Sequence, residues 1–143
     1  MRRITYLPHM RSNPLLTLTA AAYGLAGLAL TFAPAETLRG AGLTPEPAMT
    51  WFLQALGAAL LALAWMNWLH RETKIGGIYG RTVLLPNLIF VSVAFWDALA
   101  AWRRAPERTL LLGIAIGLGV LSVAFGARLF GRNPQWKDDS PGR

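Results

Sequence analysis

Asp97 is the residue whose type and position point most directly to chemistry. It is the single charged residue in four long apolar windows, residues 15–33, 48–69, 82–102 and 109–127. A carboxyl group in such surroundings is costly unless it is paired. It serves either as a proton or cation site or as a hydrogen-bonding group between helices. Gln54 lies at a matching depth in the preceding window, so we expect Gln54 and Asp97 to meet across an antiparallel helix pair.

Two asparagines form a second candidate polar layer. Asn67 lies near the end of the second window and Asn87 near the start of the third, so antiparallel helices would bring both to one depth. Amide contacts of this kind contribute about 0.6–2 kcal/mol, and helix packing is their commonest use. The two histidines, His9 and His70, lie outside the windows, and the chain has no cysteine. We therefore predict no metal site, no cofactor and no catalytic residue.

A glycine-rich segment separates the second window from the third. It lacks the G-x-x-x-x-G-K-[ST] order that holds nucleotide phosphates. Gly76 and Gly77 are placed to end a helix and shape a turn. The alternative is contact with a lipid head group or a partner. That contact would use the segment Lys74, Gly76, Gly77, Tyr79, Gly80 and Arg81.

Small residues mark positions where helices could approach closely. Gly113 and Gly117 form a GxxxG pair in the last window, and Ala20 and Gly24 form a similar pair in the first. Close backbone approach supplies much of the attraction between helices in lipid. These pairs predict packing within the protein, with a dimer or partner interface as the alternative.

The composition identifies the elements that position these residues. The chain has 143 residues, of which 54% are hydrophobic and 15% charged, against roughly 25% charged in soluble domains. A helix of 19 residues is about 28 Å long, close to the roughly 30 Å apolar thickness of a bilayer. We predict an all-α integral membrane protein, an up-and-down bundle of four transmembrane helices in a single domain, 1–143. The predicted spans are about 14–33, 48–69, 83–102 and 108–130, followed by a flexible polar tail, 131–143.

Prolines and basic residues refine this topology. Asn13 precedes Pro14 in the pattern of an N-cap followed by proline at the first helical position. More lysines and arginines flank the side of the two termini and the glycine-rich segment than the opposite side. The positive-inside rule therefore predicts cytoplasmic termini, although Arg103, Arg104 and Arg108 lie on the other side. An alternative interpretation of the first span is a signal peptide with the A-x-A site Ala33-Pro34-Ala35, which would be cleaved before Glu36. The net charge of +7 indicates anionic lipid head groups as partners, not nucleic acid.

The layout resembles that of uncharacterised small four-helix proteins of bacterial inner membranes. The similarity rests on residues 32–34, on the tryptophan-rich residues 64–68, and on the Gly-Gly-x-x-Gly-Arg loop that leads into residues 85–87. It implies the four-helix fold and the bacterial inner membrane. It implies no catalytic residue, because such families have no known activity.

Three functions remain open from the residues alone. The chain offers no continuous polar face, which favours a non-enzymatic accessory or interaction subunit whose partners are membrane lipids and other membrane subunits or a homo-oligomer. The alternative is a small proton- or ion-coupled transporter or channel that uses Asp97. A membrane enzyme is disfavoured by the scarcity of histidine, cysteine and acidic residues.

Overall fold

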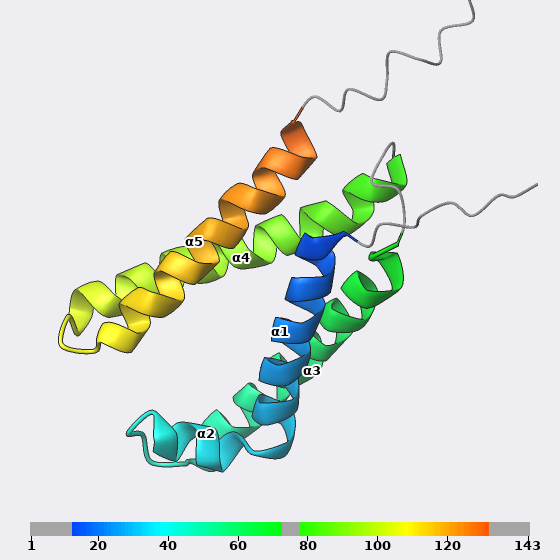
Figure 1. Cartoon of the computed structure of the whole chain (residues 1–143). Coiled ribbons are helices and arrows are strands. Elements are labelled where there is room, and N and C mark those ends of the chain that lie inside the picture. Colours follow the sequence, from blue (N-terminus) through cyan, green and yellow to red (C-terminus); the bar gives the residue numbers. More distant parts are fainter. Residues whose placement is uncertain (1–12, 73–77, 132–143) are drawn as a thin grey trace, which may run out of the picture. The chain divides into compact units, whose positions relative to one another are not determined.

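The computed structural model describes residues 13–72 and 78–131. These residues form five helices, α1 (Pro14–Phe32), α2 (Pro34–Gly40), α3 (Pro47–His70), α4 (Ile78–Arg104) and α5 (Thr109–Phe130). Figure 1 shows two compact units, one made by α1, α2 and α3 and the other by α4 and α5. The predicted tail, apart from Gly131, lies outside the described residues.

The prediction of four helices that could cross a membrane is confirmed. Pro14–Phe32, Pro47–His70, Gly80–Arg104 and Thr109–Phe130 are long and apolar enough to do so. The described residues are helical apart from short connections, and the chain is a multi-pass membrane protein of all-α class. The predicted joining of all four helices in one bundle stays a prediction, because the structure defines each unit by itself.

Helix α1 begins as the sequence predicts. Asn13 is the N-cap, and its Oδ1 accepts a hydrogen bond of 3.1 Å from the backbone N–H of Leu15. Pro14 occupies the first helical position, where its missing N–H costs no hydrogen bond. The cap thus satisfies one of the donors that every helix start leaves open.

Helices α1 and α3 form an antiparallel hairpin around two glycines (Figure 1). A Cβ atom placed on Gly27 would lie 2.9 Å from the carbonyl oxygen of Gly57. One placed on Gly57 would meet the backbone N and the Oγ1 of Thr31. These neighbours include backbone atoms, which cannot move aside as a flexible side chain could. The two helices therefore approach to a distance that only glycine permits at both positions.

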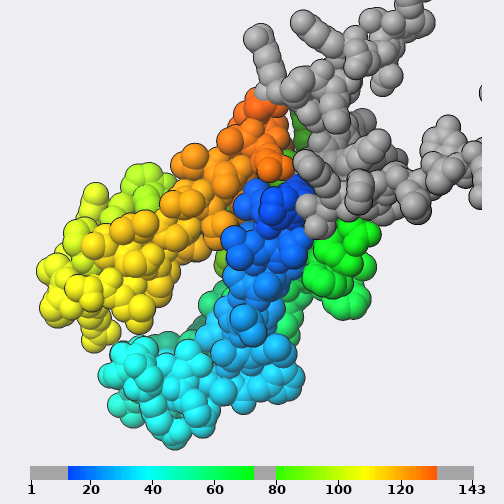
Figure 2. Space-filling view, viewed as in Figure 1, coloured from blue at the N-terminus to red at the C-terminus, as the bar shows by residue number. Residues whose placement is uncertain are grey.

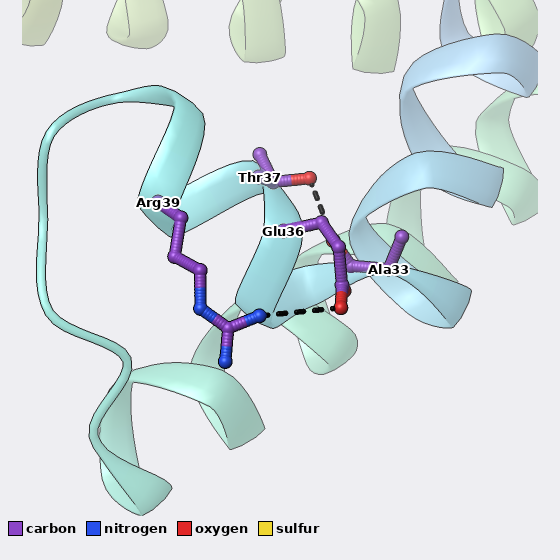
Figure 3. A network of polar contacts seen from close by, with 4 residues as sticks. All are labelled: Ala33, Glu36, Thr37 and Arg39. Atoms are coloured by element: carbon purple, nitrogen blue, oxygen red, sulfur yellow. Dashed lines mark hydrogen bonds and ion pairs between the residues drawn. The ribbon is translucent and has the colours of Figure 1, made fainter.

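The connection from α1 to α3 contains the short helix α2, which the sequence did not predict. Its Leu38 is buried, while Glu36 and Arg39 are exposed and form an ion pair of 3.4 Å (Figure 3). The same view shows the Thr37 hydroxyl donating to the carbonyl of Ala33, at 2.8 Å. This local pairing and one buried leucine explain how so short a segment remains helical.

A glycine turn ends α2. Gly42 has φ of +74°, a left-handed conformation that residues with a Cβ rarely adopt. Its N–H donates to the carbonyl of Arg39, and the N–H of Leu43 donates to that of Leu38, each at 2.9 Å. This pair of bonds is the Schellman arrangement, which satisfies carbonyls left open at the helix end.

Helices α4 and α5 form the second antiparallel hairpin (Figure 1). A Cβ on Gly119 would lie 3.3 Å from the ring of Phe95, and one on Gly126 would lie 3.9 Å from Leu88. Ser92 and Ser122 share a hydrogen bond of 2.7 Å between their hydroxyl oxygens. Aromatic and aliphatic side chains of α4 thus fill the space above small residues of α5.

The helices expose many large apolar side chains. Figure 2 shows α5, yellow to orange, with its side chains on the surface of the molecule. The exposed set includes Leu110, Ile116, Val120, Val123 and Phe130 of this helix. Such surface is unfavourable in water but is the expected boundary with acyl chains in a bilayer.

Candidate functional site

A buried hydrogen bond between two polar side chains joins α1 to α3. The Nδ2 of Asn67 donates to the Oγ1 of Thr19 at 3.1 Å, and the Thr19 hydroxyl donates to the carbonyl of Leu15 at 2.8 Å. Both polar side chains are completely buried. Asn67 therefore has a partner inside its own hairpin, whereas its predicted contact with Asn87 concerns the other unit and stays a prediction.

The end of the α1–α3 hairpin nearest to Asn67 and Thr19 is held by a backbone hydrogen bond and by contacts of Arg71. The N–H of Asn13 donates to the carbonyl of Arg71 at 2.6 Å, which ties the start of α1 to the end of α3. The Arg71 guanidinium lies over the Trp68 ring, 3.6 Å from its centroid, and its Nη1 donates to the Trp68 carbonyl at 2.8 Å. Its Nη2 forms an ion pair of 2.9 Å with Glu72. The arginine is thus fixed beside a tryptophan at the helix end.

His70, the last residue of α3, is engaged by its own helix. Its Nδ1 lies 2.8 Å from the carbonyl oxygen of Met66. A carbonyl only accepts, so this nitrogen carries the hydrogen. Within residues 13–72 and 78–131 no group of three or more His, Asp or Glu side chains is placed to hold a metal ion.

A groove of about 380 Å³ runs along the α1–α3 hairpin at the same end, and we call it the α1–α3 groove. Its small residues are Ala20, Ala21, Gly24 and Ala64. Its larger ones are Thr17, Leu61, Trp65 and Trp68. The Thr17 hydroxyl already donates to the carbonyl of Asn13, at 3.1 Å. The groove therefore presents carbon surface with one tryptophan, Trp68, stacked against Arg71.

Gln54 also has a partner within its hairpin. Its Nε2 lies 3.4 Å from the carbonyl oxygen of Thr31, a long hydrogen bond at an exposed position. The Thr31 Oγ1 is buried and has no hydrogen-bond partner among the described residues. The amide of Gln54 thus contacts the last turn of α1, where backbone carbonyls lose their helical partners.

Asp97 lies on the side of α4 that faces away from α5. Leu88 packs above Gly126 of α5, and Asp97 is nine residues further on, about 180° around the helix at 3.6 residues per turn. Asp97 is exposed. The ion pairs of the described residues, Arg39–Glu36 and Arg71–Glu72, do not include it. The α4–α5 hairpin alone therefore leaves this carboxylate without compensation.

The predicted pairing of Gln54 with Asp97 joins residues of different units and stays a prediction. Gln54 lies seven residues after the start of α3, and Asp97 lies seven residues before the end of α4. Each is therefore about 10 Å along its helix from those ends. The structure describes each unit by itself, so the match in depth between the two residues also stays a prediction.

Asn87 contributes to the backbone hydrogen bonding of α4. Pro86 lies inside this helix and has no N–H to donate to the carbonyl four residues earlier. The Nδ2 of the buried Asn87 donates to the carbonyl of Val83 at 2.9 Å, one turn back along the helix. The carbonyl four residues before Pro86 is that of Thr82, so the bond to Val83 is a separate contact of Asn87 within α4.

The glycine-rich segment is described only in part. Lys74, Gly76 and Gly77 lie outside the described residues, so their predicted contacts stay predictions. Helix α4 begins at Ile78, so Tyr79, Gly80 and Arg81 belong to a helix and not to the connection that the sequence indicated. The apolar pattern that continues beyond them outweighs the roughly 1 kcal/mol cost of a helical glycine.

The two predicted small-residue pairs differ in their surroundings. Ala20 is buried, and a Cβ on Gly24 would lie 3.8 Å from the Cβ of Ala64, so the first pair lies on the face of α1 toward α3. A Cβ on Gly113 or Gly117 would meet nothing within 4 Å. The GxxxG pair of α5 is therefore not used against α4.

Comparison of the whole chain with family models, curated proteins and solved structures gave no match. The resemblance to small four-helix inner-membrane proteins therefore stays a prediction.

Proposed function

We propose that this multi-pass membrane chain works by contact, as a non-enzymatic accessory or interaction subunit. The observation that carries the proposal is the open glycine pair of α5. Ala115 is buried on the side of α5 that meets α4, and Gly113 is two residues away, about 200° around the helix. Gly113 and Gly117 thus face away from α4 and form a surface that another transmembrane helix can approach closely.

The energetics of membranes support this use of the surface. Lipid tails are as apolar as leucine, so burying side chains gives helices little reason to associate. Glycines allow two backbones to approach, and the gained van der Waals contacts then favour association. The exposed Ile116 and Val120 flank the pair and would form the rim of such a contact.

A pair of leucine substitutions tests the proposal. The chain with Gly113→Leu and Gly117→Leu fills the surface, and Ala100→Leu adds similar bulk at an exposed position of α4. In native mass spectrometry from mild detergent, we expect the unmodified chain and Ala100→Leu to carry a stoichiometric partner subunit or a second copy. In the double variant, the fraction of protein that carries this partner should fall at least tenfold. Equal retention by the double variant would overturn the proposal.

A cysteine experiment separates a second copy from a different partner. The chain has no cysteine, so Ile116→Cys introduces a single thiol beside the glycine pair. Oxidation should give a disulfide-linked dimer of this chain if the partner is a second copy. It should give a mixed disulfide, or no dimer, if the partner is another subunit.

We also propose the bacterial inner membrane as location, with both termini in the cytoplasm. The support is the excess of basic residues on the side of the termini. Single cysteines at Ser12, Thr44, Thr73 and Ser140 test this topology with an impermeant thiol reagent. Only Thr44→Cys should react from outside, and outside labelling of Thr73→Cys would contradict it.

The second candidate function, a small proton- or ion-coupled transporter or channel, rests on Asp97. Its carboxylate is exposed on α4 and stands outside the ion pairs of the described residues, and an uncompensated charge within a span is costly. Reconstituted protein should then conduct protons or ions, and Asp97→Asn should abolish the flux at unchanged thermal stability. If the carboxylate only stabilises packing, no flux is found and Asp97→Leu lowers the thermal midpoint more than Asp97→Asn.

A further inference from the structure

The α1–α3 groove lies within one half of the membrane thickness. On α1 it extends from Thr17 to Gly24, and Thr17 is three residues after the helix start. At 1.5 Å per residue, the groove thus runs from about 5 Å to about 15 Å along the helix. The apolar core of a bilayer is about 30 Å thick. The groove is therefore placed to meet lipid of a single leaflet.

The size of the groove suits a slender ligand. The groove holds about 380 Å³, which is within the range of small-ligand sites. Small residues of both helices line it together with Trp65 and Trp68. A slot of this kind takes up a slender polymethylene chain.

Positive charge stands at the head-group end of the groove. Arg71 stacks on Trp68, which itself lines the groove. The Trp68 carbonyl also holds the guanidinium there, because it accepts a hydrogen bond of 2.8 Å from Nη1. Basic positions beside membrane helices attract anionic head groups.

The ion pair of Arg71 with Glu72 does not prevent the arginine from binding an anionic head group. The side chains of Arg71 and Glu72 are 25% and 47% exposed, and an ion pair near the surface contributes about 1 kcal/mol or less. The guanidinium has five N–H donors in a planar fork, and that geometry suits phosphate. A phosphate can therefore bind Arg71 together with Glu72 or take the place of Glu72.

We propose that the α1–α3 groove binds one acyl chain of an anionic phospholipid, with the lipid phosphate beside Arg71. The chain packs on the small residues and on Trp65 and Trp68, while the phosphate accepts hydrogen bonds from the guanidinium. This site lies on the first hairpin. It is independent of the glycine pair of α5 on which the proposed function rests.

Native mass spectrometry with defined lipids tests the proposal. The purified full chain is mixed with dipalmitoyl phosphatidylglycerol or dipalmitoyl phosphatidylcholine at equal concentration. The acyl chains are the same, so a difference reports the head group. We expect a one-to-one complex with phosphatidylglycerol that an excess of free glycerol phosphate does not displace. Equal retention of both lipids would overturn the proposal.

Two matched pairs of variants locate the site. Ala21→Trp fills the groove, whereas Ala22→Trp adds the same bulk to the neighbouring exposed residue, which does not line it. Ala21→Trp should lower the bound fraction at least fivefold and Ala22→Trp should not. Arg71→Gln should lower it about fivefold, the factor for the roughly 1 kcal/mol that a basic residue near an anionic surface contributes. Arg39→Gln, on exposed α2, should leave binding unchanged, and Arg71→Lys should preserve the preference for phosphatidylglycerol.

Tryptophan fluorescence tests the same site without filling it. In vesicles, phosphatidylglycerol with brominated acyl chains should quench the tryptophan fluorescence of the full chain more strongly than brominated phosphatidylcholine does at equal mole fraction. The excess quenching should disappear when Trp65 and Trp68 are both changed to phenylalanine. An excess that persists in this double variant, or equal effects of Ala21→Trp and Ala22→Trp, would show that the lipid is not held in this groove.

Discussion

The α1–α3 hairpin and the α4–α5 hairpin solve one packing problem in different ways. In the first, Gly27 and Gly57 let two backbones approach until a single added carbon would collide. In the second, Phe95 of α4 fills the space above Gly119 of α5. The first hairpin also contains a completely buried amide–hydroxyl bond, Asn67 to Thr19, whereas the serine pair of the second is only partly buried.

This difference shows what a small-residue pair does and does not indicate. The GxxxG pair of α5, the stronger sequence signal, faces away from its hairpin partner. Gly57 has no small residue four positions before it, yet a Cβ atom at this position would collide with the backbone of α1. A glycine thus predicts that close approach is permitted, while the partner helix decides where it happens.

The largest effect that would test this contrast is expected at Gly57. Gly57→Leu forces carbon against backbone atoms of Thr31 and Gly27, and overpacking of this kind costs typically 1–3 kcal/mol and sometimes more. We expect a loss of about 3 kcal/mol in unfolding free energy, measured by thermal or detergent denaturation. Ala58→Leu, at the exposed neighbouring position, should change stability little. If both variants unfold alike, the glycine contact does not hold the first hairpin together.

A smaller effect is expected from the buried polar bond of the first hairpin. A double-mutant cycle with Asn67→Leu and Thr19→Val isolates the bond from other interactions of Asn67. Interhelical bonds of this type average about 0.6 kcal/mol, and the largest reach about 1.7 kcal/mol. Complete burial of both partners places this coupling in the upper half of that range. A coupling near zero would mean that packing alone sets the register of α1 on α3.

The smallest effect is expected from the serine pair of the second hairpin. The cycle of Ser92→Ala with Ser122→Ala removes one hydroxyl–hydroxyl bond of 2.7 Å that is partly buried. We expect a coupling of about 0.5 kcal/mol, because a serine hydroxyl that loses its partner can donate to a backbone carbonyl of its own helix instead. The measurement is again detergent denaturation of the four chains. A serine coupling larger than that of Asn67 with Thr19 would reverse the comparison of the two hairpins.

The sequence predicts the long helices well because the bilayer allows few alternatives. An apolar stretch of about 20 residues must satisfy its backbone internally, and this requirement specifies helix. The predicted spans 14–33 and 108–130 correspond to Pro14–Phe32 and Thr109–Phe130. Helix α2 escaped prediction because its seven residues carry charges and little apolar pattern. Its stability comes from contacts such as the burial of Leu38.

The sequence marks the polar residues by type but does not mark every partner. Asn67 donates to Thr19, whose hydroxyl the sequence does not indicate, while its predicted contact with Asn87 stays a prediction. Counting residues from the helix ends does place one observed pair at equal depth. Gly27 is thirteen residues from the start of α1 and Gly57 thirteen from the end of α3. The side of the helix on which each residue lies depends on packing, which hydropathy does not report.

The division of the chain into two self-contained hairpins has a consequence for its synthesis. The close contacts of Gly27, Gly57, Thr19 and Asn67 all join residues of the first unit, which ends at Thr73. At 5–20 residues per second, a ribosome needs roughly 4–14 s to make the remaining 70 residues. Helix formation takes only about a microsecond. The first helix pair can therefore leave the insertion machinery and pack in the bilayer as a finished unit before the second pair exists.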